Sequence, residues 1–184
     1  MKTDDLLLAS AKGDLQTIRA CLDAGLDPNS IHYAGGNSAL HNATYSDHAL
    51  AIKLLLDGGA DPNLRMNYRS LVDDHEERGV VALMFALSVD AAKTLIDAGA
   101  DVNVQDDSGI TPLMRAAHRG KADIVRLLLD AGADALQRTH HGQNAIDIVR
   151  DQIARYESWV IGRDRAPIAE KVGRLQRICE MLGA

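Results

Sequence analysis

The sequence predicts an all-α solenoid of about five helix–turn–helix units with short β-hairpin-like loops, and three observations lead to this prediction. First, a Gly-Ala-Asp-x-Asn element recurs along the chain. Its copies begin at Gly25, Gly59, Gly99 and, in degenerate form, Gly132. Second, aliphatic clusters such as Leu54–Leu56 and Leu127–Leu129 precede the copies. Third, aromatic residues make up only 3% of the 184 residues. A core without aromatic rings must be filled by aliphatic side chains, which suits small repeated helical units.

The stretch from Asp107 to Asp134 contains the signals of one complete unit. Thr111 is a good N-cap for a first helix, and Pro112 follows at the first helical position, where its missing N–H costs nothing. Gly120 is suited to end this helix in a left-handed conformation. The apolar residues of Ile124–Leu129 then predict a second helix. The Asp-x-Asn residues predict a tight projecting hairpin, because Asp and Asn side chains can bond their own turn.

This unit resembles the ankyrin repeat, whose pattern reads G-x-T-P-L-H-x-A-A-x-x-G, then an aliphatic helix, then L-L-x-x-G-A-D-x-N. The resemblance extends over nearly the whole chain and implies a single ankyrin-repeat domain over residues 1–184. The expected units span about 1–30, 31–63, 64–103, 104–136 and 137–184. In the family the His of the T-P-L-H element bonds backbone between neighbouring repeats, which implies a structural rather than a catalytic role for His41.

Several departures from the repeat predict local differences in structure. About ten residues are inserted within 64–78, and about three are missing around Ser88–Asp90. Asp47 stands where the fourth unit has Gly120. The fifth unit predicts a longer helix through Trp159, a break from Gly162 to Pro167 and a closing amphipathic helix. Because stacked repeats need polar terminal caps, we interpret this tail as an extended C-terminal helical cap.

The charge is uneven along the chain. Residues 155–184 hold six Lys/Arg and four Asp/Glu, while residues 1–154 hold 14 Lys/Arg and 22 Asp/Glu. An acidic body argues against nucleic acid as the main ligand, because phosphate contacts need clustered Lys and Arg. We interpret the basic tail as a solvated face of the helical cap.

The sequence favours a cytoplasmic protein. No stretch approaches the length of apolar chain that spans a bilayer, and the N-terminus lacks the pattern of a secretory signal. Cys21 and Cys179 both fall within apolar helical patterns, so we expect buried, reduced thiols rather than a disulfide.

Motifs that carry chemistry are scarce. The sequence contains no G-x-S-x-G, no Gly-rich phosphate loop and no C-x-x-C, and we expect no cofactor and no enzyme activity. His140 and His141 are adjacent on an expected hairpin and form the alternative metal-binding or catalytic site, although a polar partner contact is favoured. The acidic run 73–77 lacks the spacing of a calcium loop, so a solvated loop is favoured over a partner-specific acidic finger.

The resemblance implies recognition through the hairpin tips and the exposed ends of the first helices, which stacking places along one concave side. The corresponding residues of this chain are Tyr33, Asn37, Tyr45, Ser46, Tyr68, Arg69, Asp74, Glu76, Asp107, Ser108, Ile110, His118, Arg119, His140, His141 and Gln143. Three of the four tyrosines of the chain fall in this set. Interfaces favour tyrosine because it combines a large contact area with a polar tip.

We therefore expect a non-catalytic protein-binding module that is monomeric when free, with an inhibitor or an immunity/antitoxin-type protein as a specific hypothesis. An adaptor that bridges two proteins is the alternative. The acidic body suits a partner with a basic surface, and no membrane is implied. A further class is a self-associating protein that uses the outward apolar position Leu8 or the tail.

Overall fold

The computed structural model describes residues 2–31, 37–69, 76–159 and 166–183 of the chain. The chain folds as two compact units. The first unit contains residues 1–101 and 105–107, and the second contains residues 102–104 and 108–184. Each unit is built from pairs of antiparallel helices, so the predicted all-α repeat fold is confirmed.

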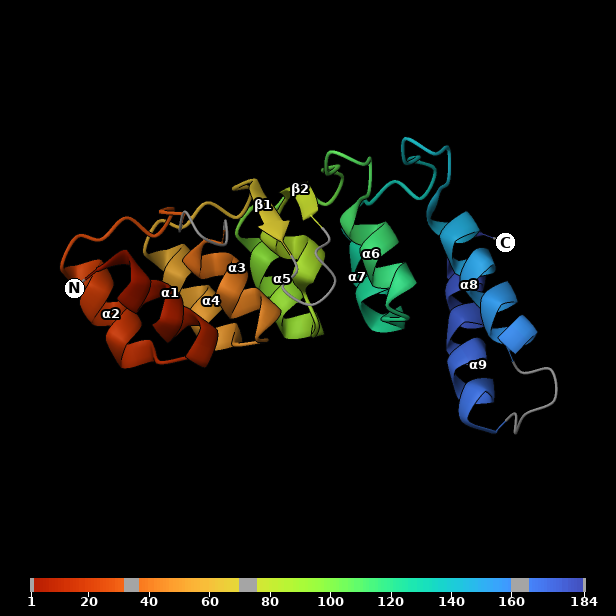
Figure 1. Cartoon of the computed structure of the whole chain (residues 1–184), viewed down its shortest axis with the longest axis horizontal. Coiled ribbons are helices and arrows are strands. Elements are labelled where there is room, and N and C mark those ends of the chain that lie inside the picture. The colour runs from red at the N-terminus through yellow and green to blue at the C-terminus, as the bar shows by residue number, and fades with distance from the viewer. Residues whose placement is uncertain (1, 32–36, 70–75, 160–165, 184) are drawn as a thin grey trace. The chain divides into compact units, whose positions relative to one another are not determined.

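In the first unit, three helical pairs follow one another along the chain (Figure 1). The elements are α1 (Thr3–Lys12), α2 (Leu15–Asp23), α3 (Ala39–Tyr45), α4 (Ala49–Asp57), β1 (Met66–Arg69), β2 (Glu76–Val80), the 3₁₀ helix η1 (Ala82–Phe85) and α5 (Val89–Asp97). The first helices form one row, in which α1 packs on α3 and α3 on η1. The second helices form another row, in which α2 packs on α4 and α4 on α5.

The second unit continues the same pattern with longer helices at its end. Its elements are α6 (Pro112–His118), α7 (Ala122–Asp130), α8 (Ala145–Trp159) and α9 (Ala166–Met181). Here α6 packs on α8, α7 packs on α9, and α8 and α9 pack on each other. The predicted long helix through Trp159 and the closing helix are both present, and most of the predicted break lies outside the described residues.

The first helices α3 and α6 begin at side-chain caps. The Thr111 hydroxyl accepts a hydrogen bond from Met114 N at 3.2 Å, as the sequence predicts, and Ser38 caps α3 in the same way. Ser88 caps the second helix α5 by accepting from Ala91 N at 3.2 Å. Each cap satisfies a backbone donor that has no partner inside its helix, which is worth about 1 kcal/mol.

The core of each unit is aliphatic. Fully buried side chains include Leu6, Ile18, Leu40, Ile52, Leu55 and Leu95 in the first unit, and Leu113, Leu128, Leu175 and Ile178 in the second. Burial of each of these side chains contributes about 1.5–3 kcal/mol relative to exposure. Cys21 is buried among them, as predicted, but Cys179 is only half-buried, so that part of the thiol prediction is wrong. Cys179 lies near the last turn of α9, where solvent reaches one side of the helix.

Asparagine side chains tie successive repeats together within each unit. In the first unit Asn63 donates from its amide to the Gly99 carbonyl at 2.9 Å and accepts from Asp101 N at 2.8 Å. In the second unit Asn103 makes the same two contacts, to the Gly132 carbonyl at 3.1 Å and from Asp134 N at 2.8 Å. These pairs form an asparagine ladder that bridges one hairpin to the next.

The ladder corrects part of the turn prediction. The aspartates do bond their own turns, since Asp61 Oδ1 accepts from Asn63 N at 2.8 Å. The asparagines instead reach the following repeat, because the hairpins lie close enough for one amide to bond two backbone groups of its neighbour. Leu136 replaces the asparagine in the degenerate fourth copy and is 76% exposed.

Candidate partner-binding surfaces

The end of α3 presents an aromatic side chain to solvent. Tyr45 is the last residue of this helix and is 57% exposed. Its ring meets the Phe85 ring edge-on, with centroids 6.2 Å apart and an interplanar angle of 63°. Phe85 itself is 4% exposed and lies against His41 with the same centroid separation. The Tyr45 ring is therefore held in one place while most of it stays accessible.

The contact lies beside the shortened part of the third unit. The sequence predicts the deletion between the helices, and the structure shows that the first helix is reduced to the short 3₁₀ turn η1, followed closely by α5. Phe85 is the last residue of η1 and makes ring contacts with His41 and Tyr45 of the preceding repeat. The ends of the two repeats are joined by a hydrogen bond of 2.5 Å from the Ser88 hydroxyl to the Asp47 carboxylate. Asp47 adopts a left-handed conformation, with φ of 58°.

His41 is buried beside Phe85 and is 3% exposed. Its Nδ1 lies 2.7 Å from the Ser38 hydroxyl, within its own repeat. Burial lowers the pKa of His41 to about 4, and the backbone of Val80, which belongs to the next repeat, acts in the opposite direction. A buried imidazole that stays neutral at physiological pH agrees with the structural role expected for this position.

The inserted segment of the third unit forms a two-stranded antiparallel hairpin, β1–β2. Met66 pairs with Val80, Tyr68 with Glu77 and Arg69 with Glu76, with an irregularity between the first two pairs. The strand pairing thus brings three residues of the predicted site, Tyr68, Arg69 and Glu76, to one end of the hairpin. Two other predicted residues, Tyr33 and Asp74, lie outside the described residues.

The base of this hairpin is anchored to the 105–107 loop of the same unit. Arg65 donates from Nη1 to the Gln105 carbonyl and from Nη2 to the Asp107 carboxylate, both at 2.9 Å. Asp107 N donates to the Arg78 carbonyl at 2.9 Å. Gly79 adopts φ of 68°, and a Cβ there would collide with Arg65 and Asp107. Asp107, a predicted partner contact, therefore also holds the hairpin in place.

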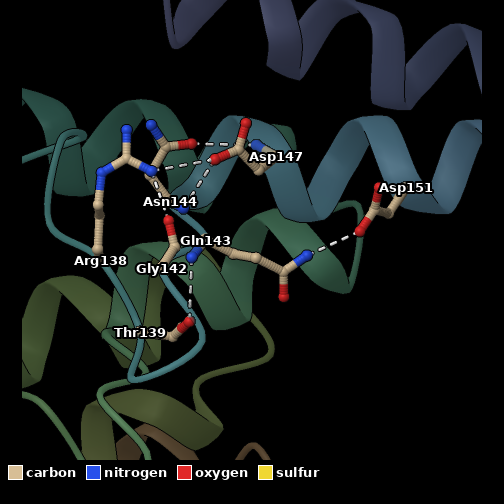
Figure 2. A network of polar contacts seen from close by, with 7 residues as sticks. All are labelled: Arg138, Thr139, Gly142, Gln143, Asn144, Asp147 and Asp151. Carbon is tan, nitrogen blue, oxygen red and sulfur yellow. Dashed lines mark hydrogen bonds and ion pairs between the residues drawn. The ribbon is translucent and has the colours of Figure 1, made fainter.

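In the second unit the turn at 138–144 is fixed by a polar network (Figure 2). Gly142 N donates to the Thr139 carbonyl at 2.8 Å, and the Arg138 guanidinium donates to the Gly142 carbonyl. The predicted residue Gln143 is tied down, because its amide donates to Asp151 at 2.7 Å. His140 and His141 are exposed at the tip, and His140 N donates to the Ser108 carbonyl at 3.0 Å.

Metal binding at this tip has no further support from the neighbouring residues. Within the described parts of the chain, no group of three or more His, Cys, Asp or Glu side chains is placed to hold a metal ion. Among the other predicted residues, Ser108 is exposed, while Asn37, Ser46 and Ile110 are half-buried. Asn37 donates to the Asn42 side chain at 3.2 Å.

The end of α6 opens into a pocket of the second unit. This pocket has a volume of about 300 Å³ and is lined by His118, Arg119, Gly120, Gln152, Glu170, Lys171, Arg174 and Leu175. Sequence reasoning placed His118 and Arg119 in the site but missed Gln152, Lys171 and Arg174. The basic composition of the tail was a signal for the two cations. It was not decisive, since a solvated helix face has the same composition.

The predicted site residues are distributed over both units, and the two units differ in net charge. The first unit contains 8 Lys/Arg and 17 Asp/Glu, a net charge of −9. The second unit contains 12 Lys/Arg and 9 Asp/Glu, a net charge of +3. The sign of the charge therefore changes between the two units, far earlier in the chain than the basic tail at 155–184.

Comparison with known proteins identifies the family of this chain. Two family patterns described as "Ankyrin repeats (many copies)" match residues 6–56 and 95–149. The chain belongs to the ankyrin repeat family. Ankyrin repeats are protein–protein interaction modules and are generally non-enzymatic, so the repeats of this chain form an interaction module.

The proteins to which this chain is similar carry different names. An L-asparaginase of Dirofilaria immitis is 28% identical over 163 residues, 88% of this chain. A probable E3 ubiquitin-protein ligase of Oryza sativa subsp. japonica is 30% identical over 146 residues, 78% of the chain. A putative ankyrin repeat protein of fowlpox virus is 30% identical over 128 residues, 67% of the chain. The chain spans only 26%, 27% and 36% of the length of these three relatives.

None of the helices in the described parts of the chain is long and apolar enough to cross a membrane.

Proposed function

We propose that this ankyrin repeat protein binds a partner protein through the exposed end of α3 and the β1–β2 hairpin. It acts without catalysis, by covering a surface that the partner needs, as an inhibitor or an immunity/antitoxin-type protein. The observation that carries the proposal is Tyr45, whose ring packs against Phe85 and is still 57% exposed.

A fixed, exposed aromatic ring is the kind of side chain that dominates binding energy. Tyrosine is enriched among interface residues whose truncation costs 2 kcal/mol or more. A ring already held by a neighbour loses little further freedom on binding, which lowers the entropic cost of association. Tyr45 meets both conditions, because its ring packs against Phe85 and the residue is 57% exposed.

The charge of the first unit indicates the chemistry of the partner. A net charge of −9 on this unit favours approach to a basic protein surface and disfavours an acidic one. The expected partner therefore presents clustered Lys and Arg side chains to the face that carries Tyr45. A nucleic-acid-directed enzyme is one example of such a protein.

The test begins with recovery of partners on the immobilised full chain from its native cell, followed by mass spectrometry. Binding of a recovered partner is then compared between the wild-type chain, Tyr45→Ala and Leu50→Ala. Leu50 is 69% exposed on α4, a second helix, and gives a matched loss of exposed apolar area. We expect Tyr45→Ala to weaken binding by about thirtyfold, the equivalent of 2 kcal/mol, and Leu50→Ala to leave it unchanged.

Two controls make the outcome decisive. Thermal unfolding shows whether Tyr45→Ala remains folded, and Tyr45→Phe keeps the ring contact with Phe85. Equal affinity of the wild-type chain and Tyr45→Ala would place the interface elsewhere. An inhibitor role additionally requires that the activity of the recovered partner falls when the chain is added in equal amount.

A second candidate is an adaptor, favoured by the opposite charges of the two units. An acidic first unit and a basic second unit suit two partners of different surface charge. A ternary complex that survives size-exclusion chromatography would support the adaptor, whereas mutually exclusive binding would support the inhibitor. The same experiment with light scattering on the free chain tests the predicted monomer.

A further inference from the structure

The pocket at the end of α6 collects positive charge from separate helices of the second unit. Arg119 follows α6, while Lys171 and Arg174 lie on α9, and all three line the pocket. Two of these residues are more than 50 positions from Arg119 in the sequence, so only the packing of the helices brings them together. Glu170 is the one carboxylate among the residues that line this pocket.

The electrostatic field in the pocket is positive at His118. Partial burial lowers the pKa of this imidazole, and the positive charges of Arg119, Arg115, Arg155 and Lys171 lower it further. These four cations come from α6 and its end, α8 and α9. Four neighbouring cations that lower the pKa of one imidazole indicate a place where an anion would be stabilised.

The walls of the pocket are held in position by local contacts. The Gln152 amide on α8 donates to the His118 carbonyl at 2.7 Å, which ties α8 to the end of α6. Lys171 Nζ lies 4.7 Å from the centroid of the Tyr156 ring, so α9 and α8 are also joined by a cation–π contact. Leu175 is 1% exposed and contributes an apolar side chain to the lining. Lys171 and the end of α6 are therefore tied to α8 before any ligand arrives.

We propose that this pocket binds the phosphate group of a phosphate monoester. A phosphate monoester carries close to two negative charges at neutral pH and offers three acceptor oxygens, so it gains more from several converging cations than a carboxylate does. The guanidinium groups of Arg119 and Arg174 can each donate two parallel hydrogen bonds to such a group. A volume of about 300 Å³ is at the lower end of ligand pockets and leaves room for the atoms that carry the phosphate.

Glu170 sets the strength of this site. Its carboxylate accepts from Arg174 Nη2 at 2.7 Å and occupies part of the donor capacity that a phosphate would use. Glu170→Gln removes the competing negative charge without shortening the side chain. We expect this variant to bind phosphate about twofold to fivefold more tightly, since exposed ion pairs contribute up to about 1 kcal/mol.

The experiment follows the imidazole of His118 by NMR in the full chain, titrated with pH in sodium chloride and in sodium phosphate at matched ionic strength. In chloride its pKa lies below the usual histidine value, for the causes given above. Bound phosphate cancels part of the positive field, so the pKa of His118 rises in phosphate. No difference between the two salts would overturn the proposal.

Three variants distinguish phosphate binding in the pocket from a general attraction of phosphate to the charge of the protein. Lys171→Gln removes a lining cation, and we expect it to weaken phosphate binding about tenfold, because hydrogen bonds to charged groups are worth about 1.5–3 kcal/mol. Arg126→Gln removes the same charge from the exposed face of α7, outside the pocket, and should leave binding unchanged. Equal losses in these two variants, or weaker binding by Glu170→Gln, would show that no specific site exists.

The source of the phosphate is distinguished by two probes. Tighter binding of N-acetyl-O-phosphoserine amide than of inorganic phosphate assigns the pocket to a phosphorylated side chain. Tighter binding of inorganic phosphate assigns it to the free ion, and binding of neither contradicts the proposal. The inference does not rest on the partner surface proposed around Tyr45, which belongs to the first unit, so either test can fail without the other.

Discussion

The end of α3 in the first unit and the end of α6 in the second unit occupy equivalent places in their repeats. The first reads Tyr45-Ser46-Asp47 and the second His118-Arg119-Gly120. Asp47 and Gly120 both adopt left-handed conformations, with φ of 58° and 69°. The backbone of the turn is thus alike, while one turn presents an aromatic ring and a carboxylate and the other presents an imidazole and a guanidinium.

The same contrast holds for the units as wholes. Asn63 and Asn103 make matching ladder contacts in the two units, so the repeat framework is conserved between them. The net charges are nevertheless −9 and +3. Within one chain, framework positions are fixed by hydrogen bonding and packing, and the exposed helix ends are free to specialise. The experiments that follow test how separate these two units are.

The largest expected effect is the loss of a buried ring in the first unit. Phe85→Ala should lower the free energy of unfolding by about 3–5 kcal/mol, because it leaves a cavity beside His41 and Tyr45. Hydrogen exchange should show the loss of protection in the first unit and little change in the second. Leu113→Ala, which empties a buried site in the second unit, should give the reverse. Equal loss of protection in both units after either change would show that they unfold as one.

The next effect is a pH dependence that belongs to the first unit. The pKa of His41 is about 4 in the folded protein and 6.5 in its ordinary state, so the unfolded chain binds the proton more readily. The contribution of neutral His41 to the free energy of unfolding is therefore fully present above pH 6.5. It is lost progressively as the pH falls from 6.5 toward 4. The loss is about 3 kcal/mol at the acidic end.

Urea unfolding at several pH values measures this loss, with His41→Gln as the control. The variant cannot titrate, so its stability should fall less steeply between pH 6.5 and 4 than that of the wild-type chain. Parallel curves for the two proteins would show that the imidazole is already accessible to protons in the folded state.

A smaller effect is expected from the asparagine ladder. Asn63→Ala removes two hydrogen bonds in the first unit, and Asn103→Ala removes the equivalent two in the second. Each variant should lose about 1–2 kcal/mol, because the contacts are partly exposed to water. Thermal unfolding and hydrogen exchange should place each loss in its own unit. Leu136→Asn restores the ladder residue in the degenerate copy and should change stability by less than about 0.5 kcal/mol.

The smallest effect concerns the link between α8 and the end of α6. Gln152→Ala removes the hydrogen bond to the His118 carbonyl and should cost the second unit about 1 kcal/mol. Gln16→Ala, at an exposed position of α2, is the matched change in the first unit and should be neutral within about 0.5 kcal/mol. Chemical denaturation is precise enough to separate the two. A neutral Gln152→Ala would mean that helix packing alone holds α8 against α6.

Features that depend on a few neighbouring residues were predictable. The cap at Thr111, the left-handed glycine after α6 and the two long helices of the tail follow from local propensity and hydrophobic spacing. The family pattern also identified the helix ends that carry Tyr45, His118 and Arg119. Within each repeat, these helix ends lie at a fixed distance from the capping and glycine residues, which can be recognised from a few neighbouring residues.

The remaining features arise from residues that are distant in the sequence. Nothing near Phe85 in the sequence indicates that its ring would contact both His41 and Tyr45. The hydrogen-bond partners of the Asn63 side chain lie in the following hairpin rather than in its own. Cys179 fits an apolar pattern and is still half-buried, since its exposure depends on which elements pack against α9.

The sequence by itself determined the repeat fold, the number and order of most helices, and the chain's place among interaction modules. These follow from short-range patterns that the period repeats several times. Only the tertiary structure decided where charge and aromatic surface accumulate. The cations that line the pocket follow α6 or lie on α9, and the net charge changes sign between two units whose segments alternate along residues 101–108. Electrostatic fields and cavities depend on distances in space, which packing sets and spacing along the chain does not.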